Sequence, residues 1–147
     1  MNWILKTFKE LTTTELYAIL KLCSEIFVVE QNCAYQDLDD KDQKAWHLFT
    51  EKDGNVLAYT RLFKSGDCYT EASIGRVVVA SSQRGTGLGH KLMKESILAL
   101  ENRFGKTPIK IGAQTHLTKF YEPHGFIKIN EEYLEDGIPH IHMLRAV

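Results

Sequence analysis

The sequence is poor in cysteine, in net charge and in long apolar runs, and each shortage argues against a class of protein. Its three cysteines, Cys23, Cys33 and Cys68, show no Cys-x-x-Cys spacing. We therefore expect neither a disulfide framework nor a thiolate zinc site, and we expect the protein to lie in the reducing cytoplasm. The formal net charge is −1, so no bulk positive field attracts nucleic acid or anionic lipid.

No stretch approaches the roughly 18 apolar residues that cross a bilayer, and the first residues lack the basic and apolar regions of a signal peptide. We therefore expect neither a membrane nor nucleic acid among the partners. Hydrophobic residues make up 44% and charged residues 25% of the chain, which is ordinary for a globular protein. The length predicts one domain over residues 1–147.

The first half of the sequence predicts a strand, a helix and an irregular connection. Residues 3–8 alternate as a strand does. Thr12 and Glu15 form a capping box that opens a helix. The apolar face of this helix is predicted to comprise Leu16, Ile19, Leu20, Cys23 and Phe27. Residues 30–44 are polar and acid-rich and predict an exposed connection.

The second half predicts an α/β domain around a mostly antiparallel sheet. Strand-like runs cover residues 46–51, 55–64 and 73–80, with Asp53-Gly54 as a hairpin turn between the first two. An amphipathic helix over residues 88–104 ends at Gly105. A strand at 108–112, a short helix at 117–121 and a strand pair at 126–130 and 138–144 complete the order. One strand-helix-strand crossover makes the sheet mixed.

A glycine-rich loop between a strand and a helix carries the strongest functional signal. It reads Arg84-Gly85-Thr86-Gly87-Leu88-Gly89. Glycines turn tightly and leave no Cβ between their amides and a ligand, and amides at a helix N-terminus bind anions. A dinucleotide fingerprint would need glycine at His90, and a P-loop would need Lys-Ser/Thr. The loop therefore indicates the diphosphate of another nucleotide-like cofactor, or else only a tight connection.

The Arg-x-x-Gly-x-Gly spacing resembles the pyrophosphate loop of GNAT acyltransferases. The chain is similar to the ElaA family of GNAT-like proteins over nearly its whole length, in segments at residues 27–35, 74–79, 84–89, 111–121 and 135–141. The resemblance implies the GNAT fold, a mixed central sheet with helices on both faces, and acetyl-CoA as co-substrate. It implies a small-molecule or peptide amine as acceptor, and a homodimer is compatible with it.

The resemblance also implies roles in cofactor binding and in acid catalysis. The pantetheine arm would pair with the backbone of a strand that splays from its neighbour, and one strand amide would polarise the thioester carbonyl. Tyr121, in a Tyr-x-x-x-Gly-Phe segment, would protonate the departing thiolate, unless it is only a packed aromatic; a phenol of pKa about 10 stays protonated at neutral pH. The predicted cofactor contacts are Val77, Val78, Val79, Arg84, Gly85, Thr86, Gly87, Leu88, Gly89, His90, Gln114, His116 and Tyr121.

The proton acceptor and the amine site remain open between alternatives. Residues of a suitable type are Glu30, His47, His116 and His140. We expect Glu30 to be the proton acceptor, because burial among its apolar neighbours would raise its pKa. His140 or a relayed water is the alternative. The acceptor pocket is predicted to involve Glu30, Gln31, Tyr35, Arg61, Arg76 and His140. The two arginines would hold an acceptor carboxylate, or pair with Glu30 or Glu71.

A metal site is not expected. His140-x-His142 would place two imidazoles on one strand face, but a third ligand at diagnostic spacing is missing. The sequence therefore predicts N-acyl transfer from acetyl-CoA to a primary amine by direct attack in a ternary complex. The alternatives are a non-catalytic acyl-CoA-binding module and an acyltransferase resembling acyl-homoserine-lactone synthases.

Overall fold

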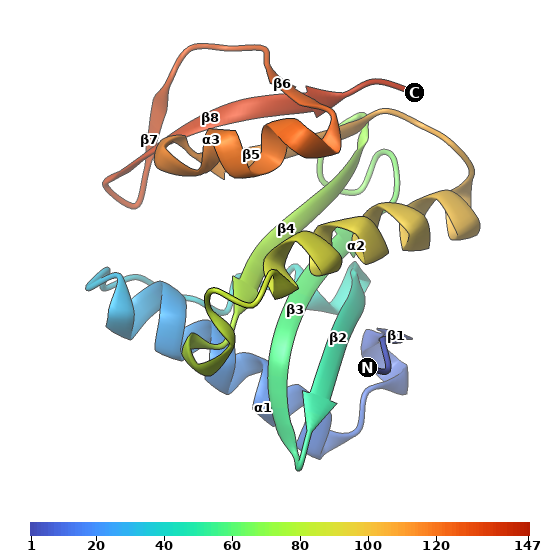
Figure 1. The fold of residues 1–147 in the computed structure, drawn as a ribbon, viewed down its shortest axis with the longest axis vertical. Helices are drawn as coiled ribbons and strands as arrows, with labels where there is room; N and C mark the ends of the chain where they lie inside the picture. The colour runs from blue at the N-terminus through green and yellow to red at the C-terminus, as the bar shows by residue number, and fades with distance from the viewer.

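The computed structural model describes residues 1–147, and one mixed sheet runs through the whole molecule (Figure 1). The strands follow the spatial order β1-β2-β3-β4-β5-β8-β6, and β7 pairs with β8. They are β1 (Ile4–Thr7), β2 (Trp46–Lys52), β3 (Asn55–Phe63), β4 (Ala72–Val79), β5 (Ile109–Gln114), β6 (Phe126–Lys128), β7 (Tyr133–Glu135) and β8 (Ile138–Arg145). Every pairing is antiparallel except β4 with β5, which confirms the predicted sheet.

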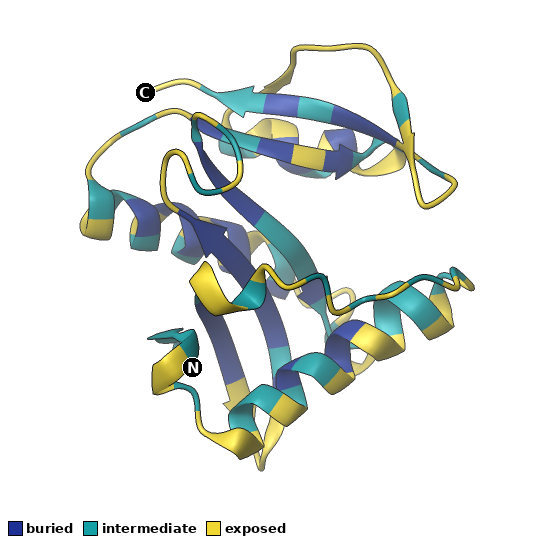
Figure 2. Cartoon of the chain, turned by 180° about the vertical axis from the view of Figure 1, so that it is seen from behind, coloured by how far each residue is buried: buried dark blue, intermediate teal, exposed yellow.

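The helices cover both faces of the sheet, as predicted. They are α1 (Thr13–Cys23), α2 (Leu88–Phe104) and the short α3 (Thr118–Tyr121). The views from front and back show α1 on one face and α2 and α3 on the other (Figures 1 and 2). The capping box is present: the Glu15 amide donates to Thr12 Oγ1 at 3.0 Å, and the Thr12 amide donates to the Glu15 carboxylate at 2.9 Å. A π-helical turn, Ser24–Glu30, extends α1.

The core has two main parts, one on each face. Under α2, Met93, Ile97 and Leu100 pack against Ile74 of β4 and Ile109 of β5. Under α1, a second set comprises Ile19, Leu22, Cys23, Phe49, Val56, Tyr59 and Val78. The buried α1 residues are Ile19, Leu22 and Cys23. The predicted apolar face is therefore rotated toward Leu22.

The strand β7 was not predicted. It forms a hairpin with β8 through Asp136 and Gly137, which both have positive φ (52° and 77°). Asp53 and Gly54 have nearly the same angles (53° and 79°) at the predicted β2–β3 turn. Positive φ at both central residues is the type I′ geometry that Asp-Gly favours. The same dipeptide was thus the available signal for the missed hairpin.

The parallel pair β4–β5 splays apart, as predicted. Only Ala72 with Ile109 and Ser73 with Lys110 are in register, while β5 stays paired with β8 along its length. From Ile74 onward β4 has strand pairing on its β3 side alone. One edge of β4 is therefore free to face a ligand. No helix of the structure has the length and apolar character needed to cross a membrane.

Strand β4 also contains a β-bulge at Arg76. Arg61 pairs with Gly75 and Tyr59 pairs with Val78, so Thr60 alone lies opposite both Arg76 and Val77. Arg76 has a φ of 52°, in the left-handed region that side chains other than glycine avoid. The strand predicted as regular is therefore kinked at its centre.

Candidate active site

The glycine loop has the conformation of an anion-binding turn. Gly85 and Gly87 have φ of 78° and 81°, which glycine adopts without strain. The loop enters the 17-residue helix α2, whose N-cap Gly87 provides no side-chain cap. The Leu88 amide makes a long contact of 3.4 Å with Thr86 Oγ1. The next amides of α2, at Gly89 and His90, are left for a ligand, with the positive end of the helix dipole behind them.

Two other loop positions are structural. A Cβ on Gly89 would lie 3.2 Å from the Phe120 ring, so glycine allows α2 to approach α3 without displacing that ring. Thr86 donates through Oγ1 to the Gln83 carbonyl at 2.6 Å. Of the predicted cofactor contacts, Thr86 alone does not line the cavity described next. Its hydroxyl braces the loop from within.

A cavity of about 1120 Å³ occupies the gap between β4 and β5 and extends from the glycine loop to the β7–β8 hairpin. It brings together all the other predicted site residues. They are Glu30, Gln31, Tyr35, Arg61, Arg76, Val77, Val78, Val79, Arg84, Gly85, Gly87, Leu88, Gly89, His90, Gln114, His116, Tyr121 and His140. Segments far apart in the sequence therefore converge on one site large enough for an extended cofactor and a second molecule.

Tyr121 of α3 contributes a buried phenol to the cavity wall. It is 6% exposed, and its ring lies edge-on to Phe120 and Phe126, at centroid distances of 5.0 and 6.2 Å. Burial raises the pKa of Tyr121 to about 12, because a phenolate is poorly solvated there. The hydroxyl therefore remains protonated at neutral pH and is available as a proton donor.

His140 of β8 has one ring nitrogen committed and one available. Its Nδ1 lies 2.7 Å from the Ile138 carbonyl. A carbonyl only accepts, so Nδ1 carries the proton. In the neutral ring Nε2 then has a free lone pair, and Glu135 Oε2 lies 3.4 Å from it. His140 is 8% exposed and has the geometry of a proton acceptor oriented by its neighbours.

The prediction that Glu30 is buried among apolar side chains is wrong. Glu30 is exposed, and both of its carboxylate oxygens accept hydrogen bonds from Arg84 of the glycine loop. This pairing lowers the pKa of Glu30, whereas burial was predicted to raise it. The π-helical turn ends at Glu30, and the preceding Val29 is also exposed, so the apolar residues do not bury this carboxylate.

Residues 31–39 form an extended segment, here termed the strap, that crosses the α1 face of the sheet. Its odd-numbered residues are partly buried and its even-numbered residues exposed, as expected of an extended chain lying on a surface. Gln31 accepts from Gln114 at 3.3 Å, and Cys33 Sγ lies 3.3 Å from the Asp136 carbonyl. These two contacts tie the strap to β5 and to the β7–β8 turn and bound the cavity on that face.

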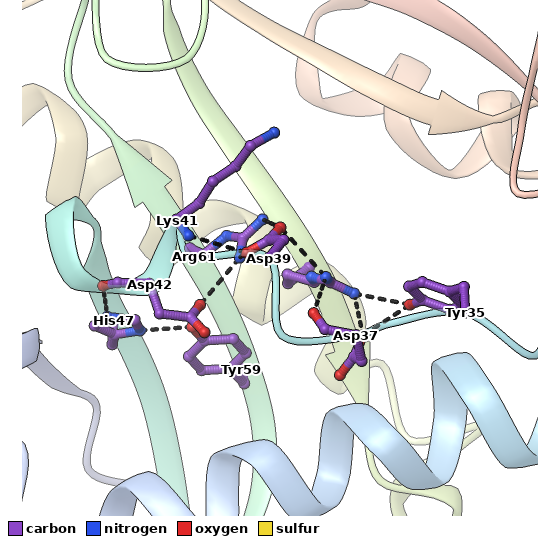
Figure 3. Close-up of polar contacts among 9 residues, drawn as sticks. Tyr35, Asp37, Asp39, Lys41, Asp42, His47, Tyr59 and Arg61 are labelled. Carbon is purple, nitrogen blue, oxygen red and sulfur yellow. Dashed lines mark hydrogen bonds and ion pairs between the residues drawn. The ribbon is translucent and has the colours of Figure 1, made fainter.

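The strap also pairs with Arg61, which is buried, and with the partly buried Arg76, and this corrects their predicted partners. Arg61 donates to both carboxylate oxygens of Asp39 at 2.9 Å and to Asp42 at 3.0 Å. Arg76 donates to Tyr35 Oη at 2.9 Å and to the Asp37 carboxylate and carbonyl. Figure 3 shows this network between the strap and the strands. Neither Glu30 nor Glu71 is a partner, and the acid-rich connection is largely neutralised.

His47, another candidate proton acceptor, lies outside the cavity. It is 1% exposed, and its ring nitrogens lie 2.6 Å from Tyr59 Oη and 2.9 Å from the Asp42 carbonyl. Burial lowers its pKa. His47 is a neutral structural residue that anchors the end of the acid-rich connection.

Two tyrosines at the hairpin end of the cavity were missed. A Cβ on Gly112 would lie 2.8 Å from Tyr133 Oη and 3.4 Å from Tyr69 Oη, so both hydroxyls approach the β5 backbone. The Tyr133 ring stacks on His142 and His140 at 4.7 and 5.8 Å. Tyr133 belongs to the unpredicted strand β7, and Tyr69 to the β3–β4 connection, where the sequence offers no periodic signal.

No group of three or more His, Cys, Asp or Glu side chains is placed to hold a metal ion. What the arrangement does provide is an anion-binding loop, a buried phenol and an oriented imidazole around a single cavity. These features suit the binding of an anionic cofactor and proton transfer at both ends of a reacting bond.

Comparison with known proteins adds independent findings. Residues 14–146 match the model of the acetyltransferase (GNAT) domain family. Protein ElaA of Escherichia coli is 43% identical over 140 residues, which cover 94% of this chain and 92% of that protein; its crystal structure superimposes with a TM-score of 0.91, covering 99% of each chain. An acyl-CoA N-acyltransferase from Pseudomonas aeruginosa has 44% identity and a TM-score of 0.93, covering 99% of this chain and 100% of that one.

A more distant structure shares the fold alone. An aminoglycoside 6′-N-acetyltransferase complexed with coenzyme A is 14% identical, with a TM-score of 0.71 over 97% of this chain and 96% of that chain.

Proposed function

Because the chain belongs to the GNAT acetyltransferase family, we propose that it transfers an acyl group, above all acetyl, from CoA to a primary amine. The acceptor is a small molecule or a peptide. Acetyl-CoA supplies a thioester whose carbonyl carbon the amine attacks directly, in a ternary complex without a covalent enzyme intermediate. The observation that carries this proposal is that the glycine loop opens into the same cavity as Tyr121 and His140.

The loop fits the diphosphate of CoA. The N-cap Gly87 has no side chain to cap the helix, and among the amides that follow it only that of Leu88 contacts a side chain, Thr86 Oγ1 at 3.4 Å. The positive end of α2 favours an anion there. Arg84 lines the cavity beside these amides and adds a full positive charge. The free edge of β4, at Val77 to Val79, would pair with the pantetheine arm as an added strand does.

One backbone amide and one side chain of the protein would act on the reacting thioester. A β4 amide in the Val77–Val79 stretch would donate to the carbonyl oxygen as negative charge develops on it. Tyr121 would give its proton to the departing sulfur, and its raised pKa of about 12 keeps that proton in place until the bond breaks.

We assign the proton acceptor to His140 in place of Glu30. Glu30 is engaged by Arg84 and its pKa is lowered, so it is a weak base. His140 lines the cavity, and its Nε2 would take a proton from the acceptor nitrogen, directly or through a water, so that a neutral amine attacks the thioester. Arg61 and Arg76 are occupied by strap carboxylates and are not assigned an acceptor carboxylate. Gln31 and Tyr35 remain as walls of the acceptor side.

A free-thiol release assay with acetyl-CoA across a library of amines tests the proposal. Turnover that depends on an amine and exceeds hydrolysis supports it. Binding of acetyl-CoA without turnover on any amine would instead identify a non-catalytic acyl-CoA-binding module. Failure to bind acetyl-CoA at all would reject both.

A further inference from the structure

We propose that Arg76 is a positioning residue, whose side chain is clamped by the strap so that the β4 bulge keeps the Val77–Val79 backbone directed at the acyl group. The clamp comprises Tyr35, Asp37 and Asp39. This inference rests on the proposed function and adds to it a residue that touches neither the cofactor nor the acceptor.

The bulge reverses which side chains of β4 face which helix. Ile74 packs in the cluster under α2. In a regular strand Val78, four residues later, would share that face. Instead Val78 packs under α1 with Ile19 and Tyr59, and Val77 and Val79 pack on the α2 side. Arg76 is therefore the extra residue that shifts the pattern by one.

The same shift sets the direction of the backbone groups. Successive amides of a strand point to opposite edges, so one extra residue exchanges those that face the neighbour for those that face away. Beyond the bulge, β3 is the only strand paired with β4. The bulge at Arg76 thus decides which of the Val77–Val79 amides face the cavity.

Holding a non-glycine residue at φ 52° requires compensating contacts, because the Cβ crowds the backbone there. Arg76 has them. One terminal nitrogen donates to Tyr35 Oη at 2.9 Å and to the Asp37 carboxylate. The other donates to the Asp37 carbonyl at 2.7 Å and reaches Asp39 at 3.4 Å.

The clamp acts only when Arg76 lies on the α1 face. Its guanidinium is 5.5 Å from the ring centroid of Phe27, in the π-helical turn that extends α1, and 5.9 Å from that of Tyr35, in the strap. With a regular β4, Arg76 would point toward α2 and lose every one of these partners. The side-chain contacts and the left-handed backbone therefore support each other.

Alanine and glycine at position 76 separate this role from simple stabilisation. Both remove the clamp, but glycine adopts positive φ freely whereas alanine does not. Arg76→Ala should lower kcat on the order of 100-fold, the effect of losing one oxyanion donor. Arg76→Gly should recover roughly 10-fold of that loss, because the bulge survives without the clamp.

Arg103→Ala and Arg103→Gly serve as matched controls. Arg103 lies in the last turn of α2, where glycine is less stable than alanine, and neither substitution should change kcat. If Arg76 only stabilises the fold, both Arg76 variants should keep the wild-type kcat when assayed well below their melting temperatures, although alanine at positive φ is the less stable of the two. Equal kcat for the two Arg76 variants, or a slower glycine variant, overturns the proposal.

Two further measurements test the proposal if the alanine variant does not fold or if the wild-type protein shows no turnover. If Arg76→Ala does not fold, the Tyr35→Phe/Asp37→Ala double variant loosens the clamp with Arg76 in place, and an unchanged kcat there overturns the proposal. A wild-type protein without turnover refutes the proposed function instead. The clamp is then judged by amide hydrogen exchange at Val77–Val79, which should accelerate in Arg76→Ala and be restored in Arg76→Gly; equal exchange in all three proteins rejects it.

Discussion

Glu30 and Arg84 form a bidentate ion pair that joins the end of the π-helical turn to the glycine loop. Their side chains are 41% and 49% exposed, and both residues line the cavity. Arg84 is also the proposed partner of the CoA diphosphate. If Arg84 binds the diphosphate as proposed, carboxylate and diphosphate compete for one guanidinium, and we expect the cofactor to displace Glu30.

Replacing Glu30 with glutamine should tighten CoA binding about two- to five-fold, the scale of an exposed ion pair. The substitution keeps the shape of the side chain but releases Arg84. Calorimetry at low salt should show the gain, and high salt should shrink it because exposed charges are screened.

Arg84→Ala provides the control for this competition. In the Arg84→Ala background the Glu30 substitution should have no effect on affinity, because the shared guanidinium is gone. Unchanged or weaker CoA binding in Glu30→Gln alone would show that the two anions do not compete.

A charge placed in the glycine loop should abolish CoA binding while the protein stays folded. Gly87→Glu combines the strain of positive φ with a carboxylate beside the diphosphate site. Gly54→Glu is the matched control: its φ of 79° is close to the 81° of Gly87, but it lies in the β2–β3 turn, outside the cavity. Both variants should lose roughly 1–2 kcal/mol of stability, and only Gly87→Glu should lose calorimetric CoA binding. Normal affinity in folded Gly87→Glu would reject the loop as the diphosphate site.

The sequence predicts those parts of the fold that depend on neighbours along the chain. The Thr12–Glu15 capping box, the Asp53-Gly54 turn and the helix ending at Gly105 each arise from a few adjacent residues, and all three form as expected. The β4 bulge could not be predicted, because Ile74 to Val79 is uniformly apolar around Arg76. A run of this kind can place either set of alternating side chains on a given face of the sheet, and the sequence does not select between the two.

Charge pairing is the part of the site that sequence spacing does not reveal. Arg76 and Asp37 lie 39 positions apart, and Glu30 and Arg84 lie 54 apart. The first pairing depends on the path of the strap, whose sequence has neither helical nor strand periodicity. The second depends on where the π-helical turn ends. The resemblance, by contrast, selected residues that do converge on one cavity, since all but Thr86 line it.

Removing the hydroxyl of Tyr121 should slow the chemical step without weakening CoA binding. Tyr121→Phe keeps the ring packed against Phe120 and Phe126, and kcat should fall about 10²–10⁴-fold, the usual contribution of a general acid. Since burial raises the pKa of Tyr121 to about 12, its ionisation should cause no loss of wild-type activity at mildly alkaline pH. Tyr17→Phe is the control, because Tyr17 is exposed on α1. Wild-type turnover in Tyr121→Phe, with chemistry rate-limiting, would remove the residue from the mechanism.

The pH–rate profiles of two variants distinguish the two candidate proton acceptors. If His140 accepts the proton, His140→Asn should lose most turnover and also lose the acidic limb of the kcat profile. Glu30→Gln should keep that limb, because the Arg84-bound carboxylate takes no part in proton transfer. Loss of the limb in Glu30→Gln alone would return the role to Glu30. A limb retained in both variants points to a water held by the backbone.

The pairing of Asp39 with Arg61 should govern stability in acid. Burial opposes the ionisation of Asp39, but the hydrogen bonds and charge of Arg61 outweigh it and lower the pKa of Asp39 to about 2. A carboxyl whose pKa is lower in the folded state stabilises the protein above its unfolded pKa of about 3.9, and this contribution is lost as pH falls toward 2. Asp39→Asn should therefore be less stable than wild type at pH 7 by about 1–2 kcal/mol, a value reduced for partial exposure. The free energies of unfolding of the two proteins, measured in urea across this pH range, should converge near pH 2.

Asp40→Asn is the neighbouring control, since Asp40 is exposed and makes no ion pair with either arginine. Its stability should follow the wild-type curve. Parallel curves for Asp39→Asn and wild type from pH 7 to 2 would show that the pair does not set the acid response.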